Sequence, residues 1–205
     1  MTTTAFLAAL SQATRQLLAT VHTEFLPLEL AELNQQPAPA AWSILECLEH
    51  LNRYSRYYNP RLAQALTQPA PAAAATAEVG YSWLGRKFIG MMAPGNSKKA
   101  KTLQRMNPRG SRLGRKVLAE FTQQQEQLLE LLARAQQADL NRKAVPVEFL
   151  KLLKMRLGES FEFVVLHEQR HVQQALRAKA SLQPEATPDA SAPTIVARQR
   201  QTTAA

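Results

Sequence analysis

Two histidines lie four residues apart in the stretch VVLHEQRHVQQAL, residues 164–176. Read literally, His167, Glu168 and His171 form H-E-x-x-H, the helix signature of zinc metalloproteases. Residues four apart on an α-helix differ by about 40° around its axis, so both imidazoles can bind one ion. Glu168 is then a candidate general base that activates water. Its position, about 100° around the helix from His167, points it away from the ion and favours a surface or ion-pair role instead.

A zinc protease also needs a third protein ligand downstream of the histidine pair. The extended protease motif would place glycine at 174 and histidine at 177, where this chain has Gln174 and Arg177. The acidic residues further downstream are Glu185 and Asp189, in a polar, proline-rich stretch that is unsuited to packing. The sequence also predicts no strand pair that could hold a peptide substrate. The protease therefore stays as a less favoured alternative.

His50 is a better third ligand. It lies about two turns after Ser43, which forms with Glu46 the spacing of a capping box at a helix start. If this helix faces the one that carries His167 and His171, the three imidazoles would bind one ion. Its remaining coordination positions would be open to water or substrate.

Four long amphipathic segments would position these residues, and proline-rich or polar stretches such as 67–78 separate them. Pro60 is expected to kink the second helix or to end its regular part. In a bundle of such helices, sites are built from side chains that face each other across the core. We therefore predict an all-α four-helix bundle, with helices over residues 4–33, 43–66, 111–137 and 156–179.

The length of 205 residues suits one domain, which we assign to residues 1–182. Within this domain, residues 67–110 are a long linker and basic insertion between the second and third helices. After it, residues 183–205 are a disordered tail.

The single cysteine, Cys47, excludes an internal disulfide and fits a reducing cytosol, so we expect a cytoplasmic protein. Because no run of about 18 apolar residues occurs, we expect neither a membrane span nor a membrane partner.

The formal net charge is +9, and much of it lies between residues 79 and 119, which hold ten lysines and arginines and no acidic residue. Such a segment can bind an anionic partner, or it can be a solvated loop. It lacks the aromatic and glycine pattern of an RNA-binding sheet and the layout of a DNA-reading helix, so we do not expect a nucleic-acid partner.

Two stretches resemble the signatures of one family. AWSILECLEHLNRY, which contains His50, is similar to the W-S-x-x-E-x-x-x-H-L motif of the DinB/YfiT-like superfamily of metal-binding bundles. LGESFEFVVLHEQRHVQQALR is similar to its last-helix motif, H-E/D-x-x-H-x-x-Q. WLGRKFI and KKAKTLQRMNPRG also resemble the middle region of one bacterial branch. The resemblance covers about residues 4–180.

The resemblance implies an up-down-down-up four-helix bundle that holds a divalent metal, often nickel or zinc, on His50, His167 and His171. Relatives include thiol S-transferases that use bacillithiol or mycothiol, a mycothiol-dependent maleylpyruvate isomerase and metal-dependent hydrolases. In a transferase the metal would lower the pKa of a cofactor thiol, which then attacks an electrophilic substrate. Arg86 and Lys87 are candidates to bind the acidic groups of such a cofactor.

In a hydrolase the same ion would activate water, with Glu168 as the candidate base. A non-catalytic, stress-associated bundle, in which the metal mainly ties helices together, is the other alternative. A homodimer is compatible with either.

Overall fold

The computed structural model describes residues 1–68, 77–93, 96, 102–148 and 150–182. The centre of the expected linker and the expected disordered tail lie outside these residues. The described chain is mostly helical, as predicted. Its helices are α1 (Thr3–Glu24), α2 (Leu30–Asn34), α3 (Ile44–Ala65), α4 (Trp83–Met92), α5 (Lys116–Arg134) and α6 (Leu157–Ala180), with short 3-10 turns η1 (Gln104–Met106) and η2 (Ala135–Gln137).

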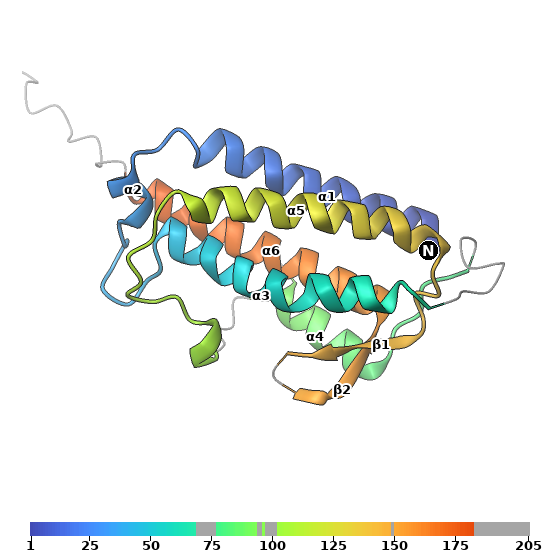
Figure 1. Cartoon of the computed structure of the whole chain (residues 1–205). Coiled ribbons are helices and arrows are strands. Elements are labelled where there is room, and N and C mark those ends of the chain that lie inside the picture. The colour runs from blue at the N-terminus through green and yellow to red at the C-terminus, as the bar shows by residue number, and fades with distance from the viewer. Residues whose placement is uncertain (69–76, 94–95, 97–101, 149, 183–205) are drawn as a thin grey trace, which may run out of the picture.

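Four long helices, α1, α3, α5 and α6, lie side by side (Figure 1). α3 contacts α5 and α6, and α1 contacts the same two helices. Their apolar faces form two clusters of buried side chains along the length of these helices. Fully buried members include Leu7, Phe25, Tyr58, Phe121 and Phe161.

The first predicted helix is shorter than the sequence pattern indicated. α1 ends at Glu24, and α2 is a separate short helix. Pro27 explains the break, because proline has no backbone N–H and disfavours the helical conformation of the residue before it. The second predicted helix has the expected start, and it continues through Pro60 to Ala65.

A strand pair is present where none was predicted. β1 (Lys143–Val147) and β2 (Leu150–Arg156) form an antiparallel hairpin, in which Val145 faces Met155 and Pro146 faces Lys154. Proline is tolerated on an edge strand, where its missing donor costs no ladder hydrogen bond. The expectation that the chain has no strand pair is therefore wrong, while the mostly helical fold is consistent with the predicted all-α class.

α4 lies inside the segment predicted as a linker. Ser82 starts it, since its Oγ accepts a hydrogen bond from the N–H of Gly85 at 3.0 Å. A Cβ at position 85 would overlap the carboxylate of Glu159, so glycine allows α4 to lie close against the start of α6. The hairpin contacts α3, α6 and α4. Together α4 and the hairpin cover the face of α3 and α6 at the bottom of Figure 1.

In the part of the chain that the structure describes, no helix has the length and apolar character needed to cross a bilayer.

Candidate metal centre

The capping box predicted at the start of α3 is present. The Oγ of Ser43 accepts from the N–H of Glu46 at 3.1 Å, and the Glu46 carboxylate accepts from the N–H of Ser43 at 2.9 Å. This fixes where α3 begins and therefore which residues of its second turn face α6. His50 lies there, with 2% of its surface exposed.

His50 on α3 meets His167 and His171 on α6. Each histidine offers one ring nitrogen, and these three nitrogens lie within 4.8 Å of one another. The Nε2 atoms of His50 and His167 are 3.1 Å apart. Two nitrogens at about 2.0–2.1 Å from one tetrahedral ion lie about 3.3 Å from each other. The spacing therefore fits a shared ion, as the sequence predicted.

Two of the rings are held through their other nitrogen. The Nδ1 of His50 donates to the carbonyl oxygen of Met106 at 2.7 Å. The Nδ1 of His171 donates to the Oε1 of Gln174 at 3.0 Å. Both acceptors place the ring hydrogen on Nδ1 and leave the lone pair of Nε2 for an ion. Gln174 therefore orients the ring of His171.

Aromatic side chains line the histidine cluster. The Trp42 ring centroid lies 4.8 Å from that of His50 and 5.7 Å from that of His171. The Tyr54 centroid lies 4.4 Å from that of His167 and 4.9 Å from that of His50. The contact of Tyr54 with the cluster was not predicted from the sequence, although its place one helical turn after His50 was a usable signal.

Burial keeps the three imidazoles neutral at pH 7. It lowers the pKa of His50 to about 4, and the positive charge of Arg53 adds to this effect. Burial and the nearby His50 lower the pKa of His171 to about 3, and burial with both neighbouring histidines lowers the pKa of His167 well below its usual value. A metal ion binds the neutral imidazole, so no imidazolium has to lose its charge before metal binding at neutral pH.

The metal-free protein is expected to lose stability as the pH falls from about 6.5 towards 4. In this window the histidines of the unfolded chain, with a usual pKa of 6.5, take up protons that folded His50 does not bind until about pH 4. The free energy of unfolding therefore decreases as the pH decreases. Thermal denaturation of the metal-free protein across this range measures the effect. A His50→Gln variant with an equally steep pH dependence would contradict the assignment.

Comparison with known families gives a match over most of the chain. A family model described as the DinB superfamily matches residues 6–175. The chain belongs to the DinB superfamily. The matched range includes all three histidines of the cluster, and it confirms the resemblance seen in the two motif stretches. Searches of curated proteins and of solved structures returned no match.

Glu168 of this DinB superfamily protein lies in the helical core. Its Oε1 accepts from the Nε2 of Gln125 on α5 at 2.8 Å, and Ser55 on α3 lies close enough to affect its pKa. Burial raises the pKa of Glu168 to about 8, so its carboxyl group is protonated at neutral pH. A general base needs to reach the proton that it removes. The contacts of Glu168 with α3 and α5 therefore give its predicted catalytic role no support.

Arg86 and Lys87 lie on the exposed side of α4. Arg86 donates to the carbonyl oxygen of Tyr81 at 3.0 Å, and the Nζ of Lys87 lies 5.2 Å from the ring centroid of Trp83. These contacts do not bring the two residues to the histidine cluster of the DinB superfamily protein. The cations that act on the histidines include Arg53 and Arg170, whose positive charges contribute to the low pKa values.

The hairpin turn holds the segment that orients His50. Arg105, next to Met106, donates through Nε to the Oε1 of Glu148 and through Nη2 to its carbonyl oxygen at 2.9 Å. Only 2% of the Glu148 side chain is exposed. From the other side, Arg53 donates to the carbonyl oxygen of Asn107 at 3.0 Å. The backbone around Met106 is therefore fixed on both sides. No local sequence pattern indicated this arrangement.

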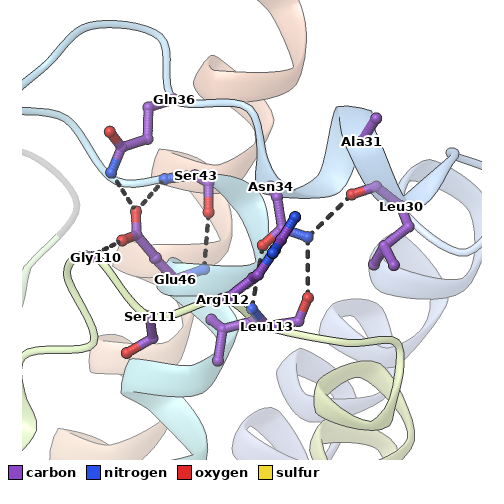
Figure 2. Close-up of a pocket in the computed structure, with 10 residues that line it drawn as sticks. All are labelled: Leu30, Ala31, Asn34, Gln36, Ser43, Glu46, Gly110, Ser111, Arg112 and Leu113. Carbon is purple, nitrogen blue, oxygen red and sulfur yellow. Dashed lines mark hydrogen bonds between the residues drawn. The ribbon is translucent and has the colours of Figure 1, made fainter.

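A separate pocket of about 530 Å³ lies beside the start of α3 (Figure 2). Within it, the Glu46 carboxylate accepts from the Nε2 of Gln36 at 3.0 Å and from the N–H of Gly110 at 2.7 Å. The Nδ2 of Asn34 donates to the carbonyl oxygens of Leu30 and Leu113. In the DinB superfamily protein these polar groups hold the segment before α5 against α2 and α3. No histidine lines this pocket.

Proposed function

We propose that this protein binds one divalent metal ion, zinc or nickel, through His50, His167 and His171, and that it is a metal-dependent enzyme. The observation that carries the proposal is the convergence of three neutral ring nitrogens, two of them on rings oriented by oxygen acceptors. Neutral imidazoles suit both metals, since each accepts nitrogen ligands.

The favoured reaction is transfer of a low-molecular-weight thiol, such as bacillithiol, to an electrophilic substrate. A bound metal ion would lower the pKa of the thiol and so supply the thiolate nucleophile. Arg53 and Arg170 add positive charge beside the histidines, which favours an anionic ligand. Burial raises the pKa of Tyr54 to about 12, so its phenol stays protonated and is a potential hydrogen-bond donor beside the cluster.

A hydrolase is less favoured because it needs a base for water. Glu168, the candidate, is hydrogen-bonded to Gln125 in the core. A non-catalytic bundle is the second candidate function, and the location of the ligands on two different helices favours it, since an ion there would tie α3 to α6. An ion without an exchangeable position for thiol or water would identify the second candidate.

The up-down-down-up topology is part of the proposal. The ion pair between Glu24 and Lys179, 2.8 Å long, joins the C-terminal ends of α1 and α6 and supports a parallel course for them. Hydrogen bonds from Asn52 to Val117 and from Asn59 to Gln124 support a parallel course for α3 and α5. Cys47 is buried and free, which supports a cytoplasmic location.

Elemental analysis of the purified protein tests the metal assignment. We expect about one zinc or nickel ion per chain, and loss of that ion in a His50→Ala variant. His22→Ala is the matched control, because His22 lies on α1 and is hydrogen-bonded to Thr122 at an exposed position. Equal metal content in the His50→Ala variant and the wild type would remove the proposed site. Conjugation of bacillithiol to an electrophile by the loaded protein then separates the enzyme from the non-catalytic bundle.

A further inference from the structure

α4 and the β-hairpin form an outer layer on one face of the molecule, over α3 and α6 (Figure 1). The inner side of this layer is buried, with Phe88 and Val145 among the buried residues. The outer side faces solvent. Neither element belongs to the four long helices, and neither supplies a histidine to the metal centre.

α4 and β2 expose large apolar side chains. Trp83 is 70% exposed and Leu152 is 99% exposed, so both side chains are accessible to solvent. Eight large hydrophobic residues are exposed in the part of the chain that the structure describes, and five of them belong to α4 and β2. These five are Trp83, Met91, Leu150, Leu152 and Leu153. Such a concentration on two neighbouring elements marks a surface that contacts an apolar partner.

The same surface is basic. The sequences of α4, β1 and β2 contain no acidic residue. Glu148, at the turn between the strands, is buried and paired with Arg105. Among the side chains of these three elements that the structure describes, Arg86, Lys87, Lys143 and Lys154 are charged and exposed. Exposed apolar side chains interleaved with cations need a partner that is both apolar and anionic.

We propose that this outer layer docks on an anionic lipid surface. Tryptophan and leucine side chains enter the boundary between headgroups and acyl chains, while lysine and arginine bind the anionic headgroups. A peripheral contact of this kind needs no membrane-spanning helix. It goes beyond the proposed enzyme, and it differs from the sequence expectation of no membrane partner. A second copy of the chain fits less well, because a two-fold contact would place the basic residues of one layer against those of the other.

The docking surface borders the metal centre at two points. At the end of α4, the carbonyl oxygen of Met91 accepts from Arg170, next to His171, at 3.4 Å. At the hairpin turn, Glu148 binds Arg105, next to the residue that orients His50. A protein docked through this layer would therefore hold its histidine cluster close to the lipid surface.

Co-sedimentation of the full chain with vesicles tests the proposal. We expect binding to vesicles of phosphatidylcholine mixed with phosphatidylserine, little binding to phosphatidylcholine alone, and weaker binding as salt increases. The double variant Lys87→Glu, Lys154→Glu should lower the apparent affinity about tenfold or more. A double variant Trp83→Ala, Leu152→Ser should lose binding and also the blue shift of tryptophan fluorescence on vesicles. Leu26→Ser, which changes an exposed leucine outside the layer, is the matched control and should bind as the wild type does.

Three results would overturn the proposal. The first is absence of binding to the mixed vesicles, or equal binding by the wild type and both double variants. The second is tight, salt-dependent binding to a DNA duplex without binding to vesicles, which would assign the basic surface to nucleic acid. The third is self-association that the double variants abolish, which would assign the layer to a second copy of the chain. Metal content, measured in the same samples, reports separately on the proposed metal site.

Discussion

Adding zinc or nickel to the metal-free protein is expected to raise its free energy of unfolding by about 2.7 kcal/mol when the free metal concentration is about one hundred times its Kd. The ion would bind ligands from α3 and α6 together, and the unfolded chain does not hold these ligands in place. For a chain of this size, the gain corresponds to a rise in Tm of about 5–10 °C. Differential scanning calorimetry of matched metal-free and metal-loaded samples measures it.

The histidine variants decide whether this gain comes from the proposed site. His50→Ala and His167→Ala should each lose most of the metal-induced rise in Tm, because each leaves two imidazoles at the cluster. His22→Ala should keep the whole rise, since His22 lies outside the cluster. A metal-induced rise of the same size in the two cluster variants would show that the ion binds elsewhere.

Breaking the contact between Arg105 and Glu148 is expected to weaken metal binding about 10–100-fold, the usual cost of losing a group that orients a metal ligand. Arg105→Ala or Glu148→Ala would free the backbone at Met106, whose carbonyl oxygen fixes the ring of His50 through Nδ1. The metal Kd, measured by competition with a chelator, reports the loss. The visible spectrum of bound Co²⁺ reports any change of ligand geometry.

Matched variants separate positioning from general loss of stability. Lys179→Ala breaks the ion pair with Glu24, which is 2.8 Å long and joins α6 to α1. This ion pair does not hold any residue that contacts a histidine of the cluster. It should leave the metal Kd unchanged. Glu148→Gln keeps an oxygen that can accept from Arg105 and should recover part of the affinity that Glu148→Ala loses. If all of these variants bind metal as the wild type does, the hairpin turn plays no part in orienting His50.

The sequence by itself determined the long helices and the three residues of the candidate metal centre. Helical periodicity is local, because apolar residues three and four apart share one face of any helix that contains them. The capping box of Ser43 and Glu46 is also local, and it set the start of α3 two turns before His50. The spacing of His167 and His171 fixed their shared direction for the same reason.

The direction of Glu168 and the partners of the histidine rings were decided by tertiary structure. A position about 100° from His167 on a helical wheel indicates that Glu168 does not point toward the ion, but it does not say which neighbouring residue Glu168 contacts. The neighbour proved to be Gln125 of α5, 43 residues away along the chain. The partner of His50 Nδ1, Met106, is 56 residues away from it. Such pairs depend on how helices pack, and no local pattern contains that information.

The outer layer was also decided by tertiary structure. The sequence of β2, LKLLKMR, has no strict alternation of apolar and polar residues, and Pro146 in β1 argued for a loop. Pairing between the two strands and contact with α3 and α6 override these weak local preferences. Periodicity could therefore predict the positions of the histidines, because they lie on long helices whose pattern is local. The hairpin and α4 depend on contacts with α3 and α6, so only the tertiary structure shows them.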